Sequence, residues 1–180
     1  MSADQAETFP FMEISMACSN LLAMETFWQE MFDGKVIFRG RMMSQPYSRM
    51  IACGITFAFR EDPDFVPPPG PGQEFMFRNH LGFRVRDLEA AIRQLEARGA
   101  RFVLTPDIVR QLQQSKQGDG RKFLETDFVA APLTTERIAA GEFKIDVAIM
   151  AGPDNLWIEL NQIKEPGDTG WFPYGELGSQ

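Results

Sequence analysis

In the N-terminal part, hydrophobic and polar residues first alternate as in a β-strand and then follow the spacing of an α-helix. Apolar and polar residues alternate over residues 11–18, which predicts a β-strand. Ser19 or Asn20 can cap a helix over residues 21–32, where Phe, Met and Trp side chains fall on one broad face. Asp33-Gly34 is expected to end this helix, and its apolar stripe is expected to belong to the core.

Three further strands and a linker are predicted after this helix. The strands cover residues 35–43, 49–53 and 55–60. Gln45-Pro46 is expected to break the chain before the second of them, and Gly54 to turn it before the third. Prolines then crowd residues 62–72 so densely that neither a helix nor a central strand is expected. A linker over about 62–78 therefore divides the chain into two halves.

The second half begins as the first did. Residues 79–85 alternate as a strand, Asp87 is expected to cap a helix through Arg98, and Gly99 to end it. Further strands are predicted over residues 100–104, 144–150 and 156–162, with a Gly-Pro-Asp-Asn turn before the last.

A strand, a helix and then further strands thus occur twice. Residues 12–21 line up in pattern with residues 79–88. Two such units can turn their uncovered sheet faces toward each other, so we expect an α+β fold of two βαβββ modules that form a curled mixed sheet around a cavity, with the helices outside. The expected organisation is a single domain over 1–180: module one over about 9–62, module two over about 79–162, an insertion over 106–141 with short helices near 109–117 and 134–140, and a tail over 163–180.

Composition narrows the class of protein. The chain is 44% hydrophobic and 12% aromatic, so it can bury a core, and its net charge is −7 without any Lys/Arg-rich run, so nucleic acid is not an expected partner. Neither a membrane-spanning stretch nor a secretory signal is predicted, and a cytoplasmic protein is expected. Cys18 and Cys53 lie in apolar surroundings and are expected to be buried small side chains rather than a disulfide or metal site.

Several motifs resemble the vicinal oxygen chelate superfamily, which includes glyoxalase I, extradiol dioxygenases and bleomycin-resistance proteins. Residues 79–91 and 95–100 resemble the opening strand and helix of a module of this superfamily. Residues 152–160 resemble its closing turn and strand, and residues 13–21 resemble the opening of the first module. The resemblance implies a small-molecule substrate or ligand. Members often pair modules between chains, so it also implies a homodimer as one arrangement.

The resemblance also implies metal ligands. The ligand positions of the superfamily fall on Glu13, His80 and Glu159, whereas the fourth position falls near Ala58, which cannot bind a metal. Mixed nitrogen and oxygen donors suit Fe, Mn, Ni, Co or Zn as the divalent ion. Glu13 and Glu159 would then be catalytic as well, with a carboxylate such as Glu13 able to act as a base.

Alternation places the three candidate ligands on the faces opposite the helix-packed residues. The alternative is that His80 is a satisfied interior histidine and that Glu13 pairs with Arg84 or Arg60. Arg84 is suited either to grip a substrate carboxylate or to form an ion pair. Trp157 is suited to line the cavity or to fill space. The candidate substrate-binding residues on these faces are Arg84, Arg60, Ser15, Thr56, Trp157 and Asn161.

Three functions remain open at this point. The first is a metal-dependent lyase, isomerase or dioxygenase that acts on a small substrate with vicinal oxygens. The second is a metal-free small-molecule-binding protein of the resistance type. The third is an assembly role through the insertion 106–141 and the aromatic tail 166–180.

Overall fold

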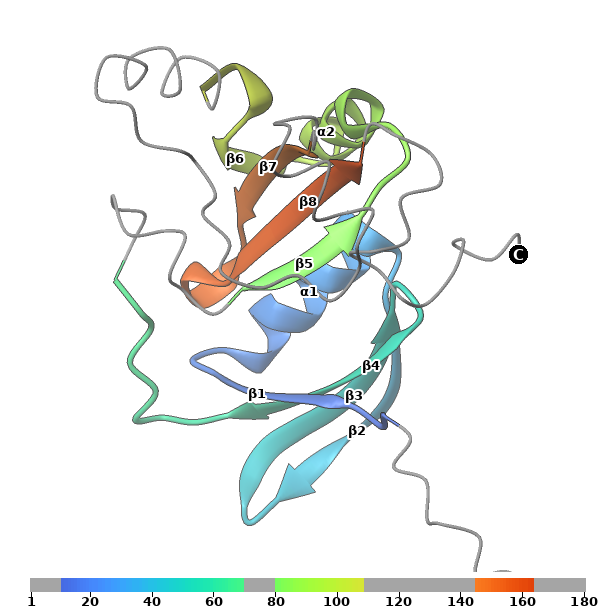
Figure 1. Cartoon of the computed structure of the whole chain (residues 1–180). Coiled ribbons are helices and arrows are strands. Elements are labelled where there is room, and N and C mark those ends of the chain that lie inside the picture. Colours follow the sequence, from blue (N-terminus) through green and yellow to red (C-terminus); the bar gives the residue numbers. More distant parts are fainter. Residues whose placement is uncertain (1–10, 70–79, 109–144, 164–180) are drawn as a thin grey trace, which may run out of the picture. The chain divides into compact units, whose positions relative to one another are not determined.

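Hydrogen-bonded strands form two separate four-stranded sheets in the computed structural model (Figure 1). The structure describes residues 11–69, 80–108 and 145–163. The chain divides into two compact units, one of residues 1–75 with 152–156 and the other of residues 76–151 with 157–180. Each unit contains one of the two sheets.

The first module has the order strand, helix and three strands. Its strands are hydrogen-bonded in the order β1-β4-β3-β2, with β1 parallel to β4 and the other pairs antiparallel. Helix α1 lies along one face of this sheet (Figure 1). The elements are β1 (Ile14–Cys18), α1 (Leu21–Phe32), β2 (Lys35–Met42), β3 (Gln45–Ala52) and β4 (Ile55–Glu61).

The second module repeats this order. Its sheet runs β5-β8-β7-β6, again with the first and last strands parallel and the other pairs antiparallel. The two βαβββ modules are therefore confirmed. The elements are β5 (Leu81–Arg84), α2 (Leu88–Ala97), β6 (Arg101–Leu104), β7 (Ile145–Ala151), the short 3₁₀ helix η2 (Pro153–Asn155) and β8 (Trp157–Ile163). The predicted helices near 109–117 and 134–140, most of the linker and the tail lie outside the described residues.

The start of α1 is fixed by two side chains. Asn20 is the N-cap, and its Oδ1 accepts from the Ala23 N–H at 2.9 Å. The Leu21 N–H donates to Oε2 of Glu61, at the end of β4, at 2.9 Å. The first N–H groups of a helix lack partners within it, so both bonds stabilise the start of α1, and the bond to Glu61 also holds the helix to the last strand of its module.

Helix α2 begins in the same way. Asp87 is its N-cap and accepts from the Ala90 N–H at 2.9 Å, while the Leu88 N–H donates to Oε1 of Gln162 on β8 at 2.9 Å. Asp87 and Leu88 are the residues that the sequence pattern aligns with Asn20 and Leu21. The internal repeat is thus confirmed down to the hydrogen bonds at its helix ends.

Helix α1 covers its sheet mainly with aromatic and methionine side chains. Trp28 is fully buried, and its ring lies 4.4 Å from that of Phe57 on β4, measured between centroids. Met24 and Met31 are buried on the same side of the helix. This confirms the predicted core stripe. Phe27 and Phe32 extend this aromatic cluster, and the centroid of each ring lies within 6.1 Å of the centroid of a neighbouring ring.

One charged residue lies inside this apolar face. The Glu25 side chain is only 1% exposed, and its carboxylate pairs with both Nε and Nη2 of Arg39 on β2. A carboxylate taken out of water is costly unless it is paired, so Arg39 is needed for Glu25 to be buried at all. The hydrogen bond to Glu25 also raises the pKa of Arg39.

Two sequence predictions about the β2–β3–β4 meander are wrong. Gln45-Pro46 does not break the chain but begins β3, where Pro46 pairs with Arg41; the turn lies just before it, at Met43 and Ser44, which both have positive φ. Proline is tolerated there because it stands next to the turn at the end of the strand.

Cys53 was expected to be buried, but it is exposed. It stands in the β3–β4 turn with a φ of 53°, and Gly54 follows with a φ of 73°. Two left-handed residues in succession make a tight hairpin turn, which projects from the sheet. Cys18, in contrast, is fully buried as predicted.

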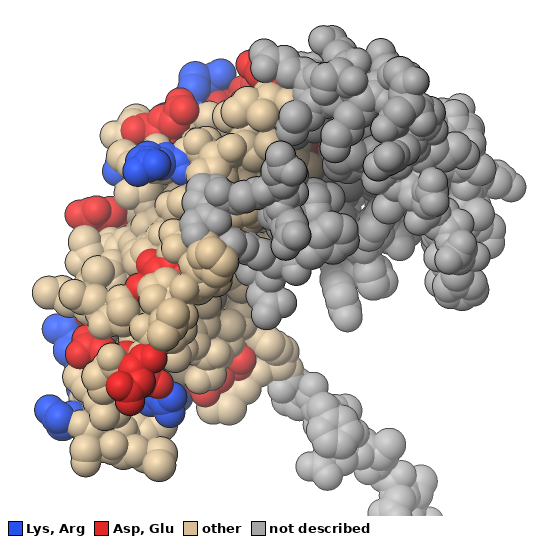
Figure 2. Space-filling view, turned by 90° about the vertical axis from the view of Figure 1, so that its left-hand side faces the viewer, with Lys and Arg blue, Asp and Glu red and all other residues tan. Residues whose placement is uncertain are grey.

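The surface carries charges of both signs. Figure 2 shows acidic and basic side chains interspersed among other residues on the face in view. In the part of the chain that the structure describes, no helix is long and apolar enough to cross a membrane.

Replacement of Arg39 should test the buried pair. Arg39→Met leaves the Glu25 carboxylate buried without its cation, so the free energy of unfolding should fall markedly. Arg93→Met removes only an exposed pair with Glu89, whose Oε2 lies 3.8 Å from Arg93 Nη1; this change should cost no more than about 0.5 kcal/mol. Urea unfolding followed by circular dichroism measures both.

The double variant Glu25→Met with Arg39→Met is the matched control for this prediction. It removes the buried charge together with its partner, so it should be more stable than Arg39→Met alone. Equal losses in Arg39→Met and Arg93→Met would show that the pair contributes nothing beyond a surface contact.

The Cys18 thiol predicts a pH dependence. Burial, with help from the nearby carboxylates of Asp154 and Glu61, raises the pKa of Cys18 from 9.0 to about 11. The folded state thus holds this proton more tightly than the unfolded state. The free energy of unfolding should therefore fall by about 2 kcal/mol as the pH rises from below 9.0 toward 11. Urea unfolding at pH 8 and pH 10.5 measures the difference. A Cys18→Ala variant with the same loss would rule out this thiol as its source.

Candidate functional site

Two predicted ligands of the second module lie in contact. Glu159 on β8 is opposite Gly82 on the parallel strand β5, and His80 precedes β5. This register leaves Nε2 of His80 3.7 Å from Oε2 of Glu159. The other carboxylate oxygen accepts from Asn161 Nδ2 at 2.8 Å, which orients the group. A histidine and a carboxylate therefore face each other on one face of this sheet.

Gly82 keeps this pair open. It lies between His80 and Arg84 on the same face of β5, and it has no side chain to cover the Glu159 carboxylate beside it. Arg84 is half-buried and pairs in register with Asn161. Trp157, next to Glu159 on the same face of β8, is only 2% exposed.

The predicted ligand of the first module is held by an arginine. Glu13 Oε2 lies 2.8 Å from Nη2 of Arg49 on β3. The alternative of an ion pair at Glu13 is thus observed, but with Arg49 rather than with Arg84 or Arg60, because β3 lies beside β4 and directs Arg49 to this face. The contact is poorly aligned, since within the described residues neither Glu13 Oε2 nor Arg49 Nε has a hydrogen-bond partner.

Strand register shows how the two modules differ. In the first module Ser15 is opposite Ala58, and Ala58 is opposite Arg49. In the second module Gly82 is opposite Glu159, and Glu159 is opposite Ile149. Ala58 thus occupies the place of Glu159, and Arg49 the place of Ile149. The first module therefore has no carboxylate at the position of Glu159, and it has the cation Arg49 next to that position.

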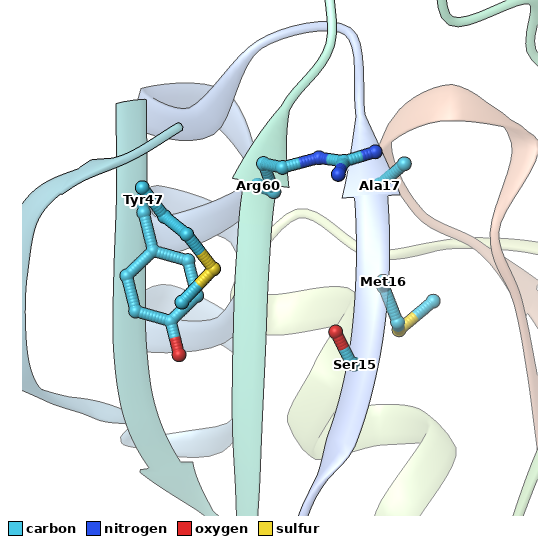
Figure 3. Close-up of a pocket in the computed structure, with 6 residues that line it drawn as sticks. Ser15, Met16, Ala17, Tyr47 and Arg60 are labelled. Atoms are coloured by element: carbon cyan, nitrogen blue, oxygen red, sulfur yellow. The ribbon is translucent and has the colours of Figure 1, made fainter. Parts of the chain in front are cut away.

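A pocket of about 170 Å³ opens on the face of the first sheet that carries Ser15 and Ala58 (Figure 3). The Arg60 side chain extends from β4 toward Ala17 on β1 (Figure 3), and its Nη2 lies 3.4 Å from Oδ2 of Asp62. Thr56, also on β4, does not line this pocket. The lining residues are Ser15, Met16, Ala17, Met42, Tyr47 and Arg60.

The predicted site residues therefore fall into two groups. The second unit brings together His80, Glu159 and Asn161, and the first unit places Ser15 and Arg60 at one pocket. Glu13 belongs to the first unit. Within residues 11–69, 80–108 and 145–163, no three His, Cys, Asp or Glu side chains form a cluster able to hold a metal ion.

Sequence reasoning missed Tyr47, Met42 and Arg49. The supposed break at Gln45-Pro46 removed Tyr47 from any predicted strand. Arg49 was placed in a strand, but alternation within that strand does not reveal that its neighbour across the sheet carries a glutamate. An uninterrupted alternation from Gln45 would have placed Tyr47 and Arg49 on one face.

The fold is similar to those of known structures. A glyoxylase/bleomycin resistance protein/dioxygenase domain from Frankia sp. EAN1pec is 17% identical, with a TM-score of 0.52 over 88% of this chain and 100% of that one. A glyoxalase family protein from Enterococcus faecalis is 16% identical, with a TM-score of 0.53 over 84% and 96%. The fosfomycin resistance protein FosX from Listeria monocytogenes, in its hexagonal crystal form, is 13% identical, with a TM-score of 0.52 over 87% and 94%.

Sequence comparison gives the family. No curated protein matches the chain. A family model described as a glyoxalase-like domain matches residues 13–112, from Glu13 through the first module and past His80. Because this match spans more than half of the 180 residues, the chain belongs to the glyoxalase-like domain family, within the vicinal oxygen chelate superfamily.

Proposed function

We propose that this protein is a metal-dependent enzyme, a lyase, isomerase or dioxygenase, that acts on a small substrate with vicinal oxygens. The observation that carries the proposal is the contact between His80 and Glu159 in the second module. Similar folds in proteins described as glyoxalase and fosfomycin resistance proteins support a small-molecule ligand, at the level of fold alone.

The two donors suit one divalent ion. His80 Nε2 and Glu159 Oε2 are 3.7 Å apart, which is too long for a hydrogen bond. Nitrogen and oxygen ligands about 2.1 Å from one ion are themselves separated by about 3.0–3.5 Å, so a small approach would let both bind it. Asn161 holds the remaining carboxylate oxygen and keeps Glu159 directed toward His80.

His80 and Glu159 would hold the ion, and a bound divalent ion would supply Lewis-acid polarisation of a substrate oxygen. The protein's own part is to place the donors and to limit access of water. Trp157 and Ile149, each 2% exposed, give the Glu159 carboxylate apolar neighbours along and across the sheet. Such surroundings strengthen electrostatic interactions at the site.

Glu13 remains the predicted third donor. Its Oε2 lies 2.8 Å from Nη2 of Arg49, but the two groups are not aligned for a hydrogen bond. For Glu13 to bind an ion or to act as a base, its contact with Arg49 must be exchanged.

A metal-free binding protein is the second candidate, and the first module favours it. Ala58 stands where the second module has a carboxylate, and Arg49 already neutralises Glu13. A face with these residues can bind a small molecule without a metal. This candidate predicts ligand binding that is unchanged by chelator.

Binding of Mn(II) to protein purified without a His tag tests the metal proposal. The wild type should bind close to one equivalent, and His80→Ala should lose this site, as followed by calorimetry and by the electron paramagnetic resonance of free Mn(II). Asn161→Ala should weaken binding by about 10–100-fold, since the carboxylate loses its orienting partner. Glu89→Gln, on the exposed face of α2, is the matched control and should bind as the wild type does. Equal Mn(II) binding in wild type and His80→Ala would contradict the proposed pair.

The role of Glu13 has its own test. If Glu13 is the third donor, Glu13→Gln should weaken Mn(II) binding about tenfold or more. Circular dichroism should show the same fold. Unchanged affinity in this variant would confine the site to the second module and leave Glu13 as the partner of Arg49.

A further inference from the structure

The pocket on the first sheet combines a cation with an apolar wall. Arg60 stands at one side, and Met42 and Tyr47 line the rest together with β1. The Tyr47 side chain is largely buried, whereas Met42 is 46% exposed. Such a surface can receive a molecule with one charged end and an apolar body.

Arg60 is the arginine of this face that is least committed to a partner. Arg49 lies 2.8 Å from Glu13 in a half-buried pair. The contact of Arg60 with Asp62 is longer, at 3.4 Å, and the side chain is 43% exposed. An exposed pair at this distance contributes little. A ligand anion can therefore replace Asp62 on the guanidinium.

Ala17 provides the space. It is opposite Arg60 on the parallel strand β1, in the register where the second module has Arg84 opposite Asn161. The small side chain of Ala17 leaves the volume above β1 open. The resulting pocket has a volume of about 170 Å³. Cavities that admit one benzene ring measure about 150 Å³, so the pocket is of a size for one such ring. Ser15 adds a hydroxyl at the same wall.

The chemistry of the anion follows from the charges. A planar carboxylate matches the fork of one guanidinium with two parallel hydrogen bonds. A dianion such as a phosphate or phosphonate would call for more positive charge than one arginine with Asp62 beside it.

We propose that this pocket binds a small aromatic acid, with the carboxylate on Arg60, the ring against Tyr47 and Met42, and Ser15 as a hydrogen-bond donor. The inference goes beyond the proposed function, because it assigns a ligand class to a pocket of the first unit, whereas the proposed donor pair belongs to the second unit. It requires no metal, so the two can be tested apart.

Benzoate is the probe for this pocket, with benzamide and phenylphosphonate as matched compounds. Calorimetry on chelator-treated wild type should show benzoate binding at least tenfold tighter than either. Arg60→Gln should weaken benzoate binding at least tenfold. Ala17→Leu, which fills the pocket, should abolish it. Arg93→Gln on α2 is the control and should bind as the wild type does. Thermal unfolding of each variant checks that the fold is kept.

Three results would overturn the inference: no benzoate binding to wild type, equal binding of benzamide, or equal benzoate binding in wild type and Arg60→Gln. Tighter binding of phenylphosphonate would also overturn the carboxylate assignment in favour of a dianion. His80→Ala separates the two proposals, since it should bind benzoate normally. Absence of Mn(II) binding in wild type that still binds benzoate would remove the metal-dependent function and leave this pocket standing.

Discussion

Parallel pairing of the first and last strand in each module is the constraint on which the rest of the structure depends. It sets Ser15 against Ala58 in one sheet and Gly82 against Glu159 in the other. Because side chains alternate across a strand, this register decides which residues share the face that the helix leaves uncovered. It also brings Glu61 and Gln162 to the first turns of α1 and α2, where each accepts a backbone N–H.

The same backbone carries different chemistry in the two modules. The second sheet places a histidine and a carboxylate in contact, and an amide orients the carboxylate. The first sheet has Ala58 at the carboxylate position and Arg49 beside it, so its glutamate is charge-paired. A repeat can thus keep its fold through backbone pairing and helix caps while its open face diverges, because function depends on side chains rather than on the fold. This divergence accounts for a donor pair in one module and an arginine-lined pocket in the other.

Much of the fold could be predicted from the sequence because its signals are local. Helix 21–32 and the cap at Asp87 depend on neighbours within a few residues, and the structure has them as predicted, while it selects Asn20 from the two cap candidates Ser19 and Asn20. The repeat of 12–21 in 79–88 is visible for the same reason. Pro46 was misjudged because its effect depends on its place next to a turn, which the residue type alone does not reveal.

The candidate site was harder to predict because its contacts join distant strands. Alternation identifies the face of Glu13 and Glu159 but not their neighbours. The partner of Glu13 depends on which strand lies next to β4, and the burial of Glu25 depends on Arg39 reaching it from β2. The pocket beside Arg60 required the order β1-β4-β3, which brings Ala17 and Tyr47 to either side of that arginine.

The central claim is that His80 and Glu159 share one divalent ion. Crystals grown with Mn(II) and measured near the manganese absorption edge test it most directly. The account predicts an anomalous peak about 2.0–2.3 Å from His80 Nε2 and from a carboxylate oxygen of Glu159. Ordered His80 and Glu159 side chains without such a peak, at full Mn(II) occupancy elsewhere in the molecule, would contradict it.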